Sequence, residues 1–317
     1  MLDELALDRA LGVVWASAVG DALGAPYEFQ PSLPDSTPVE LKAGGPWERG
    51  EWTDDTSMSV PILRELAAGH ALEDPAALGR IVAEWQDWSL GAKDVGIQTR
   101  AVLSLVRTPT EAVARASSYR VHLENGNRSA GNGSLMRTGP VALGYLGLGV
   151  EDTVAKAAAR VSELTHFEQD ATQACVLWSL AIRHAVLTGR LDVRGQLPHL
   201  GQDAAARWGA LLDEAEAKQP RDFPNNGWVV HALQAAYSAL RHGDGLLDTL
   251  ERAVRCGHDT DTVAAIAGSL AGAVYGAAAL PSEYVSALHG WPGLDAGGLQ
   301  DLVLATVNGE HVRGAGG

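Results

Sequence analysis

The sequence has few cysteines and few bulky aromatic residues. Two of its 317 residues are cysteine and three are phenylalanine, and isoleucine is also scarce. Because Cys175 and Cys256 lie far apart, they predict neither a disulfide framework nor a thiolate metal site. Cys175 is expected in the core, and Cys256 is expected to be structural, next to a polar cluster described below. With alanine and glycine abundant, this composition favours close-packed helices over a β-sandwich.

Basic charge is also scarce. The chain has 24 Lys and Arg against 39 Asp and Glu, a formal net charge of −15. This balance excludes nucleic-acid binding through a basic surface. The acidic residues are spread along the chain, which indicates a solvated acidic surface. The N-terminus, Met1-Leu2-Asp3-Glu4, lacks the basic start of a signal peptide.

Long apolar runs are almost absent. Only the run from Val263 to Leu280 is long enough to raise the question of a transmembrane helix. It is rich in alanine and glycine, and Asp259 and Asp261 stand directly at its head. We interpret it as the central helix of a soluble protein. A cytoplasmic monomer without a membrane partner is expected.

Apolar periodicity and capping signals predict helices along most of the chain. The expected helices cover residues 3–23, 53–68, 74–91, 98–107, 110–119, 152–164, 169–188, 202–218, 228–242, 246–255, 262–280 and 296–307. No run shows convincing strand alternation. We therefore predict an all-α fold, a single compact bundle of about ten helices over residues 1–313, followed by a disordered tail over residues 314–317.

Three features refine these helices. Pro61 is expected to kink the second helix or to shift its start. Asp74 is expected to cap the third, because a proline follows it at the first helical position. In the long apolar helix, glycines recur every four residues, at Gly268, Gly272 and Gly276. Because glycine is costly inside a helix, this spacing predicts that another helix packs very close there.

Two polar clusters carry the strongest chemical signal. Each holds two carboxylates and two hydroxyls in four consecutive residues, Thr53-Asp54-Asp55-Thr56 and Asp259-Thr260-Asp261-Thr262. Helix capping is the simpler interpretation, but it needs only one such residue. Four aspartates brought together in a core would repel one another unless cations neutralise them. Hard oxygen ligands without a Cys or His cluster favour Mg²⁺, Mn²⁺ or Ca²⁺ over zinc.

Three further segments are candidates for ligand binding. Gly131-Asn132-Gly133-Ser134 is a loop that leads into a helix, where backbone N–H groups can cradle phosphate, although such a sequence is often only a turn. His166 begins another helix, and it could equally belong to a capping segment with a partly exposed histidine. Asp94 lies on a loop before a helix and could be a cap or a functional carboxylate.

Taken in chain order, these segments resemble the ADP-ribosylglycohydrolase family. The resemblance spans residues of about 10 to 280 and rests on Gly20-Asp21-Ala22-Leu23-Gly24 with Glu28, Thr53-Asp54-Asp55-Thr56, Asp94-Val95-Gly96 with Thr99, Gly131-Asn132-Gly133-Ser134 with Met136-Arg137, Thr165-His166 and Gly257-His258-Asp259-Thr260-Asp261-Thr262. It implies an all-α, orthogonal helix bundle with a central binuclear metal cleft. Two Mg²⁺ or Mn²⁺ ions are the implied cofactors.

The resemblance also implies a role for individual residues. The implied metal ligands are Thr53, Asp54, Asp55, Asp259, Asp261 and Thr262. The implied catalytic residues are Glu28, Asp55 and Asp94, with Glu28 beside the metals and Asp94 near the scissile end. The implied ADP-ribose contacts are Ser129, Gly131, Asn132, Gly133, Ser134 and His166. Ala130 stands where some relatives carry an aromatic residue, so adenine must be recognised elsewhere or more weakly.

The implied reaction is hydrolysis of an N- or O-glycosidic bond at C1 of ADP-ribose, through an oxocarbenium-like transition state. The partner would be a protein ADP-ribosylated on arginine or serine, or a small ADP-ribose conjugate. Two alternatives stay open: a catalytically silent ADP-ribose binder of the crystallin kind, and another all-α magnesium enzyme. For an isoprenoid synthase, Asp54-Asp55 lacks the required third aspartate one turn later. For a phosphohydrolase, His258-Asp259 lacks an upstream histidine partner.

Overall fold

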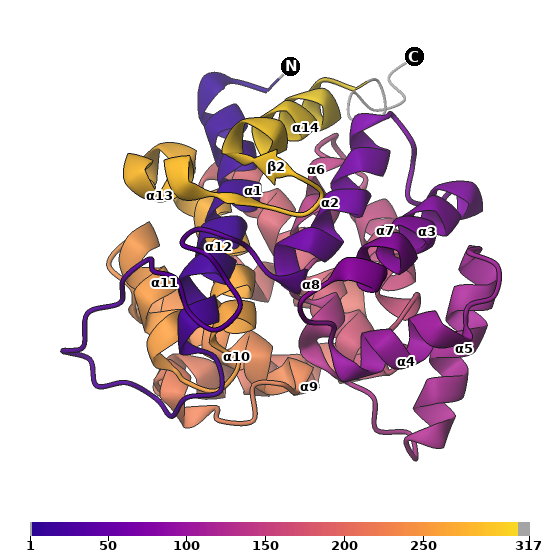
Figure 1. The fold of residues 1–317 in the computed structure, drawn as a ribbon, viewed down its shortest axis with the longest axis horizontal. Helices are drawn as coiled ribbons and strands as arrows, with labels where there is room; N and C mark the ends of the chain where they lie inside the picture. Colours follow the sequence, from indigo (N-terminus) through magenta and orange to yellow (C-terminus); the bar gives the residue numbers. More distant parts are fainter. Residues whose placement is uncertain (1, 310–317) are drawn as a thin grey trace.

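The structure, a computed structural model, describes residues 2–309, and the tail expected over residues 314–317 lies outside this range. Helices dominate the described chain (Figure 1). The α-helices are α1 (Glu4–Gly24), α2 (Asp54–Ala67), α3 (Pro75–Gly91), α4 (Ile97–Leu105), α5 (Glu111–Glu124), α6 (Gly139–Leu143), α7 (Glu151–Glu163), α8 (Gln169–Thr188), α9 (Gln202–Ala217), α10 (Val229–His242), α11 (Leu246–Arg255), α12 (Thr260–Tyr275), α13 (Ser282–Ala287) and α14 (Ala296–Asn308). The predicted all-α class is confirmed.

Helices α1 and α12 form the centre of the molecule, and their backbones touch (Figure 1). A Cβ atom added at Gly272 would lie 1.9 Å from the carbonyl oxygen of Gly12, and one at Gly268 would lie 2.2 Å from that of Ala16. Only glycine permits this approach, so the predicted close helix packing is confirmed at these two positions. Every residue of α12 from Thr260 to Ala273 is buried.

The predicted end of α12 at Leu280 is wrong. The helix ends at Tyr275, because Gly276 takes a positive φ of 83° and its N–H closes the last turn on Gly272 O. A short 3₁₀ turn, η5 (Ala277–Ala279), follows. Gly276 is therefore a helix terminator, whereas Gly268 and Gly272 are packing glycines.

The capping prediction for α3 is confirmed, because Asp74 Oδ1 accepts a hydrogen bond of 2.9 Å from Ala76 N. The expected effect of Pro61 is not seen in the helix bounds. Helix α2 begins at Asp54 and runs through Pro61 to Ala67, with the proline buried against its neighbours. Burial of the surrounding turns holds the helix together where the proline removes one backbone bond.

Some short elements carry no sequence signal long enough to detect. They are α6, α13 and an antiparallel pair of two-residue strands, β1 (His289–Gly290) and β2 (Leu294–Asp295), with His289 opposite Asp295. Periodicity needs more than two turns of helix to become visible. None of the helices in residues 2–309 has the length and apolarity needed to cross a bilayer.

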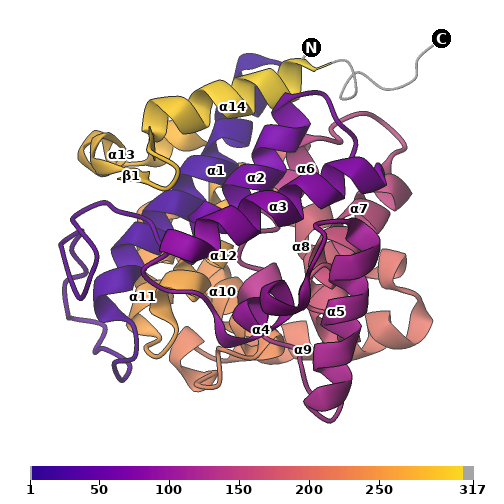
Figure 2. The same cartoon turned by 45° about the vertical axis from the view of Figure 1, so that its right-hand side comes forward.

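The helices place several chain segments around one cleft. Helices α3, α4 and α5 pack on one another beside α2, and together they face the α10–α12 side of the molecule (Figure 2). The last turn of α1 and the first turns of α2 and α12 meet at the base of this cleft. Segments near the N-terminus (α1 and α2) and near the C-terminus (α12) therefore lie side by side at the base of the cleft.

Candidate active site

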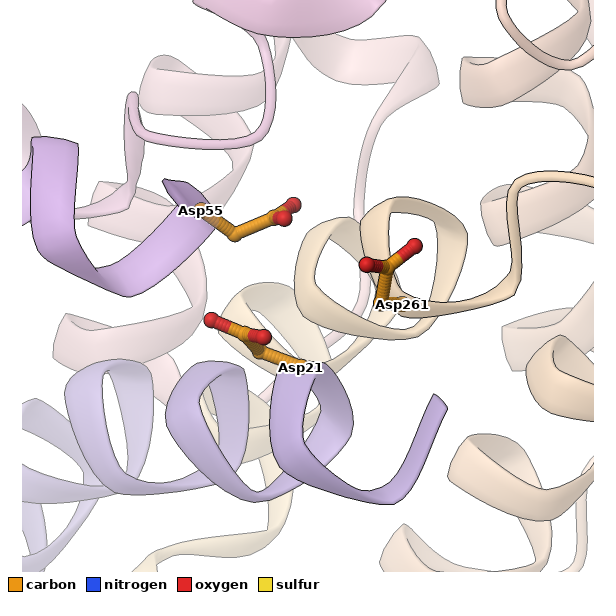
Figure 3. A group of neighbouring side chains, drawn as sticks. All are labelled: Asp21, Asp55 and Asp261. Carbon is orange, nitrogen blue, oxygen red and sulfur yellow. The ribbon is translucent and has the colours of Figure 1, made fainter. Parts of the chain in front are cut away.

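Three buried aspartates converge where α1, α2 and α12 meet. Asp21 lies in the last turn of α1, and Asp55 and Asp261 lie in the first turns of α2 and α12. Their carboxylates extend into the same space (Figure 3), with one oxygen of each within 4.8 Å of the others. The N-terminal ends of α2 and α12 favour negative charge there.

A second carboxylate group adjoins the first. Glu28, Asp259 and Asp261 also bring one oxygen each within 4.8 Å of one another. Asp261 belongs to both groups, so the carboxylates form one continuous cluster. Asp54 lines the same cleft. The structure therefore brings together the two aspartate clusters that the sequence separates by about two hundred residues.

Neighbouring polar groups orient these carboxylates. Asp21 Oδ1 accepts from Thr53 N at 2.8 Å, and its Oδ2 accepts from Thr56 N at 3.0 Å and Thr56 Oγ1 at 2.7 Å. Thr53 Oγ1 donates to Asp55 Oδ2 at 3.1 Å. Asp21 thus holds the first turn of α2 so that the Asp55 carboxylate faces Asp261 (Figure 3).

The turn before α12 is held from the opposite side. Asn132 Nδ2 donates to Asp259 Oδ2 at 2.8 Å, and Asp259 N donates to Asn226 Oδ1 at 3.2 Å. Gly257 and His258 both take positive φ values, 80° and 62°. This conformation is uncommon for a residue with a side chain, and such strain concentrates at functional sites. Here it turns Asp259 toward the cleft.

The cluster carries more negative charge than the protein neutralises. Within residues 2–309, none of its six carboxylates forms an ion pair with Lys, Arg or His. Burial, followed by repulsion from neighbouring carboxylates, raises the pKa of Glu28 to about 8 and that of Asp54 to about 7. The same causes raise the pKa values of Asp55 and Asp261 well above their usual range.

The donor set suits a divalent cation. Asp55 Oδ1 is buried and has no hydrogen-bond partner in the described residues. A buried oxygen without a donor is costly unless a cation faces it. The cluster offers only carboxylate and hydroxyl oxygens, which are the ligands preferred by Mg²⁺, Mn²⁺ and Ca²⁺.

The cluster forms one end of a long trough. A cavity of about 530 Å³, the carboxylate cleft, is lined by Glu28, Asp54, Asp94, Asp259, Asp261, Thr262, His166 and the Gly131–Gly133 segment. A second cavity, also about 530 Å³, is lined by Ser129, Ala130, Glu168 and Trp228. Because Gln98, Gly131 and Gly227 line both, the two cavities lie next to each other.

The predicted loop residues divide between these surfaces. Gly131, Asn132 and Gly133 line the carboxylate cleft, and Ser129 lines the second cavity. The 3₁₀ turn η2 (Asn132–Ser134) shapes this loop, and Leu135 N and Met136 N both donate to the carbonyl oxygen of Asn132, at 2.9 Å and 3.1 Å. The Ser134 side chain lies below the loop, where its hydroxyl accepts from Ser162 Oγ at 2.9 Å. Its side chain supports the loop and does not line either cavity.

His166 is buried, with 2% of its surface exposed, so the interpretation as a partly exposed capping histidine is wrong. It packs under the loop: a Cβ at Gly133 would lie 3.1 Å from His166 Cε1, and one at Gly131 would lie 3.3 Å from Nε2. Burial and the nearby Arg137 lower the pKa of His166 to about 3. The ring is therefore neutral at physiological pH.

A short relay sets which ring nitrogen of His166 carries the proton. Arg137 Nη2 donates to Thr165 Oγ1 at 2.8 Å, and this hydroxyl lies 2.8 Å from His166 Nδ1. Arginine can only donate, so the Thr165 oxygen accepts, and among the described residues its hydrogen has no acceptor other than Nδ1. Nδ1 is then an acceptor, and Nε2 presents an N–H donor beside Gly131 and Gly133.

Three residues of the site were not predicted from the sequence as site residues. Asp21 appeared only as part of a motif, although a lone carboxylate in an apolar, glycine-flanked helix segment is a signal of a buried functional group. Asn226 and Trp228 lie in a stretch without any motif.

Asp94, which was predicted, is exposed at the rim of the cleft. Its Oδ1 accepts a hydrogen bond from Val95 N at 2.7 Å.

Comparison with known proteins gives a consistent result. A family model described as ADP-ribosylglycohydrolase matches residues 2–313. The chain is 32% identical over 295 residues to an ADP-ribosylarginine hydrolase of Pseudomonas putida, covering 89% of this chain and 74% of the relative. It is 30% identical over 295 residues to the ADP-ribosyl-dinitrogen reductase glycohydrolase of Rhodospirillum rubrum, covering 89% and 90%. A solved ADP-ribosylglycohydrolase-related protein complex matches with a TM-score of 0.75 and 28% identity, covering 96% of this chain and 99% of that one.

Proposed function

This chain belongs to the ADP-ribosylglycohydrolase family, and from that premise we propose which residues perform its reaction. It is a hydrolase of glycosidic bonds that removes ADP-ribose from modified proteins or conjugates. Family membership over residues 2–313 removes the isoprenoid synthase and phosphohydrolase alternatives. The proposal is that the C1–N or C1–O bond of the distal ribose is cleaved at the carboxylate cluster.

The two adjoining cavities carry this proposal. Carboxylates lie at one end, the Gly131–Gly133 loop lies in the middle, and Trp228 lies at the other end. ADP-ribose has the same order of chemistry: a ribose with free hydroxyls, a diphosphate, and an adenosine. Backbone N–H groups of the Gly131–Gly133 loop, with His166 Nε2–H, would donate to the diphosphate and the neighbouring ribose.

We propose two Mg²⁺ or Mn²⁺ ions as cofactors, held by the oxygens of Thr53, Asp54, Asp55, Asp259, Asp261 and Thr262, with Glu28 beside them. The support is the unpartnered Asp55 Oδ1 and the two carboxylate groups that share Asp261. Bound divalent cations supply positive charge that can hold sugar hydroxyls and lower the pKa of water. Asp21 already accepts three hydrogen bonds from Thr53 and Thr56, so its role is to position α2.

The chain's own carboxylates would then handle the proton and the developing charge. Glu28 is half-buried at the cleft wall, where it can accept a proton from the attacking water, and Asp55 is the alternative acceptor. Asp94, at the rim, faces the end of the cleft where the leaving group departs. Carboxylates around C1 stabilise the positive charge of an oxocarbenium-like transition state.

Asp261→Ala tests the function because Asp261 belongs to both carboxylate groups. We expect release of ADP-ribose from modified proteins to fall by at least roughly a hundredfold, and chelation of wild type with EDTA to have a similar effect. Asp301→Asn, an exposed carboxylate on α14, is the control and should keep full activity. The proposal would be contradicted if Asp261→Ala kept full activity, or if wild type kept full activity after chelation. ADP-ribose binding without turnover of any conjugate would indicate the silent-binder alternative.

We propose that adenine stacks on Trp228, since Ala130 stands where some relatives carry an aromatic residue. Trp228 is half-buried, lines the second cavity together with Ala130, and can offer a ring face for stacking. Stacking of a base on an aromatic side chain contributes about 1–3 kcal/mol, so Trp228→Ala should weaken ADP-ribose binding by roughly tenfold to a hundredfold. Trp228→Phe should retain most of the affinity. Calorimetric titration with ADP-ribose measures both, and equal affinity of Trp228→Ala and wild type would exclude this role.

A further inference from the structure

A third cavity adjoins the carboxylate cleft, and Asp54 and Asp94 line both of them. Its volume is about 180 Å³, and it is lined by four tryptophans and by acidic side chains. We propose that this tryptophan cavity receives the guanidinium group of an ADP-ribosylated arginine. The inference rests on the proposed function, since it places the acceptor side chain on the far side of the reacting C1 from the nucleotide.

The aromatic walls come from three segments. Trp47 and Trp52 belong to the loop before α2, Trp88 to α3, and Trp291 to the β1–β2 turn. Trp52 and Trp88 are buried, and Trp52 Nε1 donates to the carbonyl oxygen of Trp291 at 3.1 Å. The Trp52 and Trp88 rings are therefore held in place before a ligand arrives, and preorganised aromatic faces bind planar cations well.

The charge of the cavity also favours a cation. Its acidic side chains are Glu51, Asp54, Asp87 and Asp94, and Lys93 is the lone basic residue in its lining. Lys93 Nζ lies 2.6 Å from Glu51 Oε1 and 5.2 Å from the centre of the Trp47 ring. The cavity thus already holds one ammonium between a carboxylate and an indole. Among residues 2–309, Asp87 and Asp94 have no ion-pair partner, so they can face a second cation.

Guanidinium fits these features better than the other acceptor groups. It is planar, always charged, stacks on aromatic rings and binds carboxylates through two parallel hydrogen bonds. A serine acceptor is neutral and extends only one carbon from the backbone, so it would leave the tryptophan faces and Asp87 unused. A cavity of about 180 Å³ is smaller than sites for whole small-molecule ligands, about 300–1,000 Å³, and suits a single side chain.

The kinetic test compares two conjugates that differ in the acceptor. The substrates are ADP-ribosyl-agmatine, which carries a guanidinium, and a peptide ADP-ribosylated on serine. Asp87→Asn and Trp47→Leu are the variants, because Asp87 is exposed and Trp47 is half-buried, so neither supports the core. We expect each to raise KM for the agmatine conjugate by roughly tenfold or more, without the same change for the serine peptide.

Two controls separate this effect from others. Trp228→Ala, at the adenine end, should weaken both conjugates and free ADP-ribose alike. Asp301→Asn should change none of them. The inference is overturned if Asp87→Asn and Trp47→Leu affect both conjugates equally, if they leave the agmatine conjugate unchanged, or if wild type cleaves only the serine peptide.

A binding measurement keeps the inference independent of turnover. Agmatine is titrated into wild type and Asp87→Asn, each saturated with ADP-ribose, with n-butylamine as the matched amine. We expect agmatine to bind wild type and to bind Asp87→Asn roughly tenfold more weakly. If wild type cleaves no conjugate yet binds agmatine in this way, the proposed function fails and the guanidinium subsite stands. If agmatine and n-butylamine bind equally, or agmatine does not bind, the subsite is wrong.

Discussion

Single polar residues prepare this site before any ligand enters it. Asp21 is fully buried, yet its three hydrogen bonds all go to the first turn of α2. Burial raises its pKa, and only the bonds from Thr53 and Thr56 oppose this effect. A buried carboxylate is retained in a core when it holds other groups in place. Here those groups are the neighbours of Asp55.

Thr165 is a second residue that acts through its neighbour. Thr165→Val removes the hydroxyl that donates to His166 Nδ1 and accepts from Arg137 with little change of shape. The preference for the Nε2–H tautomer should be lost, and ADP-ribose affinity should fall by a few-fold to about tenfold, the value of one net hydrogen bond. NMR of the ¹⁵N-labelled histidine rings reports the tautomer, and titration with ADP-ribose reports the affinity.

The control for this substitution is Thr306→Val. Thr306 is equally buried, but its hydroxyl donates to Leu302 O within α14, away from the cleft. It should lose stability without a change in the His166 resonances. Identical His166 spectra in Thr165→Val and wild type would show that Thr165 does not set the tautomer.

At the scale of the elements, contact between α1 and α12 determines where the aspartates stand. Gly20 and Gly24 of α1 lie against Ala264 and Asp261 of α12, with Cβ-to-backbone distances that would be 2.3 Å and 2.4 Å. This close approach brings the Asp21 turn next to the Asp261 turn. The glycines of the two helices are therefore part of the site's architecture, although none of them is a proposed ligand.

Gly272→Ala tests this packing. An added methyl group would meet the Gly12 carbonyl oxygen at 1.9 Å, so the helices must separate. Overpacking of this kind costs about 1–3 kcal/mol in the free energy of unfolding. Urea unfolding followed by circular dichroism gives the value.

Gly209→Ala is the matched control, since it lies inside α9 and an added Cβ would be 3.7 Å from Leu197 Cδ1, an ordinary contact. It should stabilise the protein by about 0.5–1 kcal/mol, because alanine is a better helix former. Stabilisation by both substitutions would mean that the α1–α12 contact is looser than the structure indicates.

At the scale of the whole molecule, six carboxyl groups without an ion-pair partner in the described chain lie together at one end of the cleft. In the metal-free protein, raised pKa values favour the protonated form of these carboxyl groups, which lowers their mutual repulsion. The pKa values of Glu28 and Asp54 rise to about 8 and about 7, against about 4.3 and 3.9 in an unfolded chain. Between these limits the folded state binds more protons than the unfolded state, so its stability falls as pH rises.

We therefore expect the metal-free protein to lose stability between about pH 4 and about pH 8. Divalent cations compete with protons for the same oxygens, so the rise in melting temperature caused by Mn²⁺ should be larger near pH 8 than near pH 6. Thermal unfolding in EDTA and in Mn²⁺ across this range measures both effects. A rise in melting temperature that does not depend on pH would show that the cations bind away from the cluster. Asp261→Ala should remove the pH-dependent part.

Local patterns in the sequence are enough to predict the long helices and the chemistry of the clusters. Periodicity and caps are local properties, so the bounds of long helices such as α8 and α11 follow directly from the pattern of residues. The two aspartate clusters, the Gly131 loop and His166 also stand out locally. Their order along the chain was sufficient for the resemblance to the family, which the comparisons confirm.

Which residues meet depends on how the helices pack against one another. Asp21 joins the cluster because α1 packs against α12, and Trp228 reaches the trough because its segment pairs with Gly131. The tryptophan cavity combines a loop, a helix and a turn that are up to about two hundred and forty residues apart. Such contacts depend on the packing of distant faces, which no local pattern encodes. The sequence alone predicts the carboxylate clusters. The fold places the Trp228 cavity and the tryptophan cavity next to them.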